Sequence, residues 1–169
     1  MSTLFIRPLI ALAMLASLST NAAQPKDALT GSWISDHDRT MDYIQRNVKM
    51  EDLAIRFLDT LMGHMTLRFS DGELHLVFPD NEVMVNGELK PFEGFESKSA
   101  YTVLYGDERE VVIRSTQPVT GKPNITTYHF DGKDVMWAYQ GSSDPGVPDL
   151  HIREYFKRTE ESHVARVEP

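Results

Sequence analysis

The sequence predicts a mainly β protein: an antiparallel up-and-down barrel of about eight to ten strands, with a helical insertion between the first and second strands. Three observations lead to this fold. From His64 onward, apolar and polar residues alternate with the period of a strand that has one buried face. Turn sequences that contain glycine interrupt that alternation repeatedly. One early stretch, residues 41–62, has the three- and four-residue apolar spacing of a helix instead.

The composition limits the class of protein. A chain of 169 residues fits one domain of ordinary size. Its 25 acidic and 17 basic side chains give a formal net charge of -8, which argues against nucleic acid or an anionic lipid surface as the main partner. Because the chain has no cysteine, disulfide frameworks, thiolate metal sites and cysteine nucleophiles are excluded.

Residues 1–23 are typical of a secretory signal peptide. Arg7 is their single charge, an apolar run follows from Leu9 to Ala16, and small or polar residues lead to Ala23. The apolar run is too short to cross a bilayer, which takes roughly 20 residues. We therefore expect this segment to be removed and the protein to be exported. A bacterial periplasm is the first expectation and the extracellular space the second, because small extracellular domains usually depend on disulfides.

The rest of the chain divides simply. Residues 24–28 read as a polar linker, residues 29–158 as the barrel domain and residues 159–169 as a flexible charged tail.

The helical insertion follows the first strand, residues 29–35. Met41 and Ile44 begin an apolar stripe with helical spacing, and a second stripe runs from Ile55 to Met62. The stretch between the two stripes has no clean periodicity. One long helix and two short helices therefore both remain open.

The other strands are short and separated by turns. Asp71-Gly72 is typical of a two-residue hairpin turn, and Asn86-Gly87 is a second such signal. The expected strands cover residues 65–70, 73–78, 82–86, 90–98, 100–105, 110–115, 124–130, 134–140 and 151–157. Short strands in series favour a meander that closes on itself.

The first strand contains Gly31-Ser32-Trp33, and the last reads Ile152-Arg153-Glu154-Tyr155-Phe156-Lys157-Arg158. With helices before the second strand, this layout resembles the calycin group, which contains the lipocalins and the intracellular fatty-acid-binding proteins. The helix placement is more similar to the fatty-acid-binding branch, and the whole pattern resembles small lipocalin-like domains of the bacterial envelope. The resemblance implies that Trp33 stacks under Arg153 or Arg158 and closes the base of the barrel.

The resemblance also implies a carboxylate clamp. In fatty-acid-binding proteins an Arg-x-Tyr pair of the last strand grips the ligand, and Arg153 and Tyr155 match that spelling. These two residues share one face of the strand. The alternative places Ile152 and Phe156 inside, with Arg153 and Tyr155 in water. Alternation cannot choose, because Glu154 must share the face of Ile152 and Phe156.

The barrel interior offers bulky side chains to a ligand. Together with Arg153 and Tyr155, the candidate ligand-binding residues are Phe69, Leu76, Phe78, Tyr128 and Trp137. The same side chains could equally fill a closed barrel.

Catalytic and metal sites are not expected. The sequence has no nucleophile elbow, phosphate-binding glycine loop or zinc-protease helix. Asp36-His37-Asp38 and Met62-Gly63-His64-Met65 carry side chains that suit zinc or monovalent copper, but neither has the paired spacing of a dedicated site. We therefore expect no enzymatic activity, no cofactor and no metal.

Two hypotheses about function follow. The first is an exported, soluble, lipocalin-like protein that binds a small apolar or amphipathic ligand inside the barrel, with Arg153 and Tyr155 orienting a carboxylate if the ligand carries one. The alternative is a filled barrel that acts in the cell envelope by binding a basic protein partner, through its acidic surface or residues 141–148. Neither hypothesis includes nucleic acid or stable membrane insertion. Space inside the barrel distinguishes the two.

Overall fold

The computed structural model describes residues 25–117, 120–140 and 151–159. The predicted signal peptide, the loop at 141–148 and almost all of the predicted tail lie outside these residues. The described residues form three helices: α1 (Pro25–Leu29), α2 (His37–Asn47) and α3 (Asp52–Leu61). The insertion after the first strand is therefore two short helices. The expected linker at 24–28 is wrong in part, because most of it forms α1.

The strands are all antiparallel to their neighbours, and the protein is mainly β as predicted. They are β1 (Gly31–Ser35), β2 (Thr66–Ser70), β3 (Glu73–Phe78), β4 (Asn81–Val85), β5 (Glu88–Phe92), β6 (Phe95–Ala100), β7 (Thr102–Gly106), β8 (Glu110–Thr116), β9 (Pro123–Phe130), β10 (Val135–Gln140) and β11 (Ile152–Thr159). Nine of them form one sheet in the order β6-β3-β2-β1-β11-β10-β9-β8-β7, and β4 and β5 form a separate hairpin.

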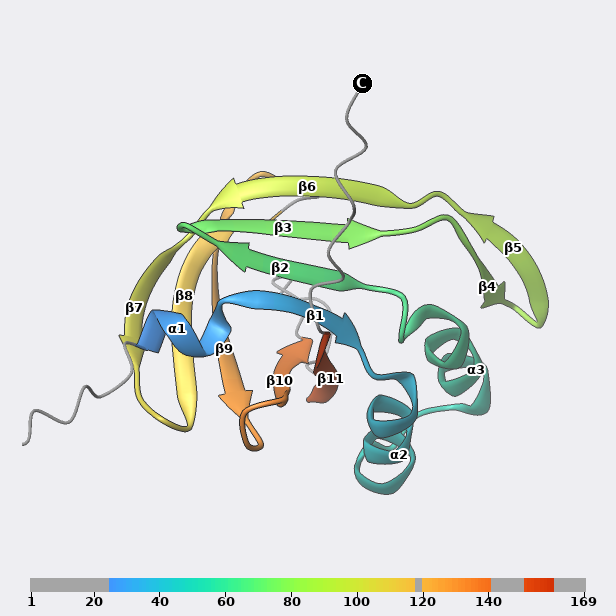
Figure 1. Cartoon of the computed structure of the whole chain (residues 1–169). Coiled ribbons are helices and arrows are strands. Elements are labelled where there is room, and N and C mark those ends of the chain that lie inside the picture. The colour runs from blue at the N-terminus through green and yellow to red at the C-terminus, as the bar shows by residue number, and fades with distance from the viewer. Residues whose placement is uncertain (1–24, 118–119, 141–150, 160–169) are drawn as a thin grey trace, which may run out of the picture.

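A single bent segment brings the two edges of the sheet together. β6 and β7 are the edge strands, and only Tyr101 separates them in the chain. β6 pairs with β3, whereas β7 pairs with β8. The main-chain N–H of Tyr101 donates to the Gly72 carbonyl at 2.8 Å, which fixes the bend beside the β2–β3 turn. The sheet therefore curls into a nearly closed barrel (Figure 1).

One end of the barrel is a packed base. Trp33 is fully buried there with Phe69 and Phe156, and its indole N–H donates to the Leu29 carbonyl of α1 at 2.8 Å. The guanidinium of Arg158 lies 4.1 Å from the centre of the Trp33 ring. This confirms the expected stacking and selects Arg158 over Arg153.

The glycine two residues before Trp33 has a structural reason. Gly31 has a φ of +118°, a conformation that side chains disfavour. A Cβ on Gly31 would also lie 2.9 Å from a guanidinium nitrogen of Arg158. The glycine of the Gly-x-Trp motif is therefore needed where Arg158 packs over the base of the barrel.

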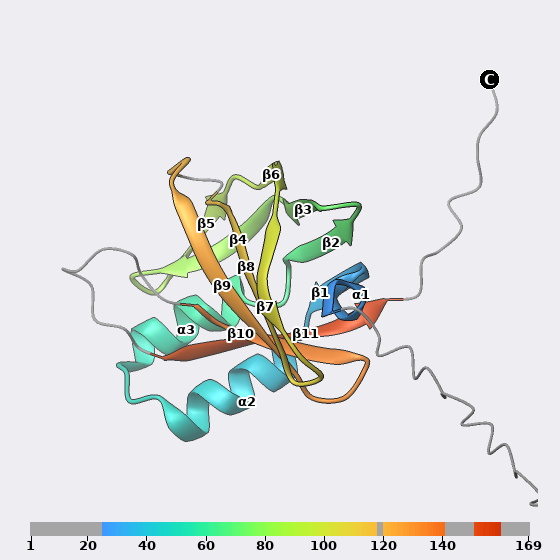
Figure 2. The ribbon, with the colours of Figure 1, turned by 90° about the vertical axis from the view of Figure 1, so that its left-hand side faces the viewer.

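Helices α2 and α3 lie at the opposite end from α1 (Figures 1 and 2). Asp36 caps α2 by accepting a hydrogen bond from the Arg39 N–H, and α2 then packs on β11. The two helices bury an apolar cluster against the start of the last strand: Met41, Ile44, Leu58, Met62 and Ile152. This cluster covers one side of that end of the barrel.

The β4–β5 hairpin rests on α3. The hydroxyl of Thr60 accepts from the Met84 N–H at 2.8 Å, and the Thr60 carbonyl accepts from the Asn81 side chain at 2.7 Å. At its return to the barrel, a Cβ on Gly94 would lie 2.3 Å from the Phe78 carbonyl oxygen, so only glycine fits. The hairpin thus extends the end that carries α2 and α3.

Candidate functional site

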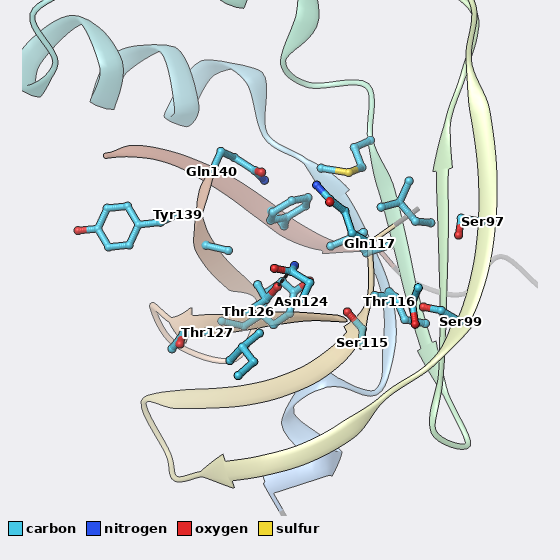
Figure 3. A pocket seen from close by; sticks show the side chains of 18 of the residues that line it. Ser97, Ser99, Ser115, Thr116, Gln117, Asn124, Thr126, Thr127, Tyr139 and Gln140 are labelled. Carbon is cyan, nitrogen blue, oxygen red and sulfur yellow. Dashed lines mark hydrogen bonds between the residues drawn. The ribbon is translucent and has the colours of Figure 1, made fainter. Parts of the chain in front are cut away.

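A cavity of about 550 Å³ occupies the half of the barrel away from Trp33. Strands β2, β3, β6, β8, β9, β10 and β11 contribute side chains to it (Figure 3). The lining residues are Met65, Leu67, Leu74, Leu76, Phe95, Ser97, Ser99, Ser115, Thr116, Gln117, Asn124, Ile125, Thr126, Thr127, Tyr128, Ala138, Tyr139, Gln140 and Phe156. The barrel is therefore packed at one end and hollow at the other.

The lining combines an apolar part with an uncharged polar part. Leu67, Leu74 and Phe156 belong to the first, where the cavity borders the core. Hydroxyl and amide groups of β6, β8, β9 and β10 form the second (Figure 3). Among the described residues, those that line the cavity include no Lys, Arg, His, Asp or Glu. Such a surface can bury an apolar body and hydrogen-bond a neutral polar group.

Breaks in strand pairing surround this half of the barrel. β8 pairs with β7 only as far as Arg114, so Ser115 and Thr116 continue beyond the ladder. β9 pairs with β10 only at His129 and Phe130. The far half of the β8–β9 hairpin is therefore joined to neither neighbouring strand in the part of the chain that the structure describes. Its polar side chains, among them Ser115, Thr116 and Asn124, line the cavity.

A buried carboxyl group lies beside the cavity. Glu154 is 3% exposed and points inward from β11, between Ile152 and Phe156. Its Oε1 accepts from the Ser35 hydroxyl at 2.6 Å, and its Oε2 accepts from the Gln140 amide nitrogen at 2.6 Å. Burial raises the pKa of Glu154 to about 7, although both hydrogen bonds favour the charged form. Gln140 also lines the cavity, so it connects this carboxyl group to the interior.

The predicted apolar residues divide between the cavity and its surroundings. Leu76 and Tyr128 line it. Phe69 lies in the core beneath, edge-on to Tyr128 with 5.4 Å between ring centres. Phe78 does not line the cavity. Its ring stacks on that of Phe95, which is a lining residue, with 5.9 Å between the ring centres. The alternation in the sequence thus predicted that these four side chains are inward, but not which of them line the cavity and which lie in the surrounding core.

The expected carboxylate clamp has a different geometry. Arg153 and Tyr155 alternate with the inward residues of β11 and lie on the outer face of the barrel, as does Trp137. The Arg153 guanidinium sits 4.0 Å from the Trp137 ring centre and 4.7 Å from that of Tyr43, on α2. The inward orientation was therefore wrong. The two apolar neighbours of Glu154 enter the barrel, and hydrogen bonds compensate its carboxyl group.

The polar wall was not predicted from the sequence. Ser97 and Ser99 alternate with Glu96 and Lys98 along β6, and neither serine is among the predicted site residues. The available signal was that small polar residues stand where neighbouring strands carry large apolar ones. Small side chains at inward positions leave the space that forms the cavity.

The Asp36-His37-Asp38 segment uses its histidine in contacts with carboxylates. His37 contacts Asp38 at 3.1 Å and Asp59 at 3.2 Å, and these interactions raise its pKa. Within residues 25–117, 120–140 and 151–159, no group of three or more His, Cys, Asp or Glu side chains is arranged to hold a metal ion.

The fold and the cavity define a small, nearly closed antiparallel β-barrel with a partly open cavity. Comparison with protein-family models, curated proteins and solved structures finds no match to this chain. In the described part of the chain, no helix has both the length and the apolar character needed to span a membrane.

Proposed function

We propose that this protein binds a small amphipathic molecule inside the barrel, and that the polar end of this ligand is uncharged. The observation that carries the proposal is the cavity of about 550 Å³ with its apolar side and its neutral polar side. Ligand sites of small molecules usually fall between about 300 and 1,000 Å³. The filled-barrel alternative has no comparable support, because it requires that this space be occupied by side chains.

The lining argues for the chemistry of the ligand. An apolar tail would be buried against Leu67, Leu74 and Phe156, and each Å² removed from water contributes roughly 25 cal/mol before the cost of association. A polar head would exchange its water for hydroxyl and amide groups. A carboxylate head would find no cation among the described lining residues, so the proposed ligand differs from the fatty acid that the Arg153–Tyr155 clamp implied.

The proposed class is a lipocalin-like carrier. Three features support it: a base closed by Trp33 and Arg158, helices between β1 and β2, and a chamber at the far end. Export, to a periplasm first and to the extracellular space second, is proposed on residues 1–23 alone. Binding rather than catalysis is the proposed activity.

The test is native mass spectrometry of protein exported to a bacterial periplasm and purified without detergent. We expect a reproducible added mass that organic solvent releases and that the cavity-filling change Ser97→Phe removes. Its outward neighbour provides the control, because Lys98→Phe adds the same ring to the other face of β6 and should keep the added mass. A bare mass that stays unchanged after exposure to neutral amphiphiles such as decanol would reject the proposal.

A further inference from the structure

One hydrogen-bonded network connects the last strand, the first strand and the cavity. The Gly63 N–H donates to the Ser35 hydroxyl at 3.1 Å, and that hydroxyl donates to Oε1 of Glu154. On the other side, the Gln140 amide nitrogen donates to Oε2 of Glu154. Glu154 is buried, whereas Gln140 is exposed and lines the cavity. The network therefore ends on a group that a ligand can touch.

An ionised carboxylate accepts hydrogen bonds and cannot donate them. Its two oxygens are matched here by two donors, the Ser35 hydroxyl and the Gln140 NH₂ group. A Gln140 amide in the opposite orientation would place its carbonyl oxygen against the carboxylate, which is repulsive. Ionised Glu154 therefore fixes the direction of the Gln140 amide and turns its carbonyl oxygen away from the carboxylate.

We infer that Glu154 is a positioning residue that sets the hydrogen-bonding character of the cavity through Gln140. With Glu154 ionised, Gln140 presents an acceptor, so the cavity prefers ligands whose neutral polar end donates a hydrogen bond, such as an alcohol or a primary or secondary amide. With Glu154 protonated, the carboxyl group can donate to the Gln140 carbonyl oxygen. The amide then turns over, and the NH₂ group becomes available to an acceptor such as an ether or ester.

Glu154 is the titratable member of this network, since Ser35, Gly63 and Gln140 contribute only uncharged groups to it. Tyr128 of β9 is the titratable group that interacts with it, and burial together with Glu154 raises the pKa of Tyr128. β1 presents Ser35, and the segment before β2 presents Gly63. α2 and α3 present the apolar cluster on the same side, and His37 of α2, whose pKa is also raised, lies against Gly63. Burial raises the pKa of Glu154 to about 7, which places both states within an accessible range.

The decisive experiment is a pH titration of the side-chain amide signals of Gln140 in the ligand-free, full-length mature protein, by NMR. We expect a transition with a midpoint near the pKa of Glu154, and we expect Glu154→Gln to abolish it. Ser35→Ala provides a matched variant: it removes a hydrogen bond that lowers this pKa, so the transition should persist with a higher midpoint. Gln117 is an internal control, because its amide also lines the cavity and accepts from Thr120 rather than contacting Glu154. A pH-independent Gln140 amide, or a transition unchanged by Glu154→Gln, would overturn the inference.

A ligand pair tests the consequence, which rests on the proposed function. Decanol and decyl methyl ether have similar apolar chains, but only decanol donates a hydrogen bond. At about pH 8.5 we expect decanol to bind roughly tenfold more tightly, the ratio that one hydrogen bond commonly gives. Near pH 5.5 the ratio should fall to about one or below, and Glu154→Gln should remove its dependence on pH. Equal affinities at both pH values would contradict the inference, whereas binding of neither probe would count against the proposed function and leave the amide titration to decide the role of Glu154.

Discussion

The side chain of Arg158 joins the last strand to the first by stacking on Trp33. The guanidinium lies 4.1 Å from the centre of the indole ring and also donates to the carbonyl oxygens of Thr30 at 2.6 Å and Ala28 at 2.8 Å. Its Nε donates to the Lys133 carbonyl at 3.1 Å, in the β9–β10 turn. The base of the barrel is therefore held by a cation–π contact and by hydrogen bonds to three carbonyl groups in two segments, the α1–β1 junction and the β9–β10 turn.

Replacing Arg158 should open this base. Arg158→Met keeps much of the aliphatic volume but leaves the three carbonyl groups without their donor and removes the cation–π contact. We expect the free energy of unfolding to fall by about 2–4 kcal/mol in urea denaturation. Arg158→Lys retains the charge but not the fork of donors, so its loss should be intermediate. If Met and Lys variants are as stable as the original protein, the base is held by apolar packing alone.

The stability of the protein should depend on pH through Glu154. Because its pKa is raised from 4.5 to about 7 by burial, the folded state holds this proton more tightly than the unfolded state. The contribution of Glu154 to the free energy of unfolding is fully present below the pKa of the unfolded state. It falls by about 3 kcal/mol as the pH rises from about 4.5 to 7.

Glu154→Gln provides the comparison, because other groups that titrate in this range, such as His37, are shared by both proteins. The stability difference between variant and original should move in favour of the variant as pH rises through this window, in urea denaturation at a series of pH values. Parallel curves would show that the carboxyl group is not buried in its charged form.

Filling the cavity should prevent binding without unfolding the barrel. Ser97 points into the cavity from an edge strand, so Ser97→Phe places a ring in open space. We expect affinity for the neutral dye Nile red to fall by about tenfold or more, measured by fluorescence titration. Lys98→Phe should bind within about twofold of the original, since that side chain faces outward. Equal losses in both variants would place the dye on the surface.

Arg153 should matter for stability and not for binding. It packs against Trp137 of β10 and Tyr43 of α2, so Arg153→Ala should loosen α2 and lower the free energy of unfolding by about 1–2 kcal/mol. Nile red affinity should stay within about twofold. A large loss of affinity in a variant with intact circular dichroism would restore the carboxylate-clamp hypothesis.

The hydroxyl of Tyr101 is buried and has no hydrogen-bond partner among the described residues. Its ring packs edge-on against Phe69 at 5.5 Å, a contact that phenylalanine would keep. Tyr101→Phe should therefore raise the free energy of unfolding by about 1 kcal/mol, because the desolvation cost of the hydroxyl disappears. A clear destabilisation in thermal unfolding would mean that the hydroxyl is hydrogen-bonded in solution.

The fold was predictable because its signals are local. Alternating strands, the hairpin at Asp71-Gly72 and the apolar stripe that begins at Met41 each involve neighbours in the sequence. The Trp33–Arg158 contact was expected because short motifs in the first and last strands resemble those of the calycin group. Local signals were sufficient for much of the architecture because strands such as β2 and β3, or β8 and β9, follow their partners closely in the chain, whereas β1 and β11 do not.

The site was less predictable because its determinants are not local. The inward face of β11 depends on how Glu154 is accommodated, and its partner Ser35 lies 119 residues away in the sequence. The space in the barrel depends on small residues such as Ser97 and Ser115, which line the cavity from separate strands. Neither the inward face of β11 nor the space in the barrel can be predicted from the alternation of residues along a single strand.

The pairing of β1 with β11 places Ser32 opposite Thr159, so the barrel is completed by the first and the last of its described strands. Before β11 emerges, one edge of β1 has no neighbour, and the nascent chain cannot close the sheet. The last strand then delivers Glu154, Phe156 and Arg158 together, which supply the buried carboxyl, part of the chamber wall and the seal over Trp33. Because such distant pairings form slowly, we expect the closure of the barrel to follow the formation of its local hairpins.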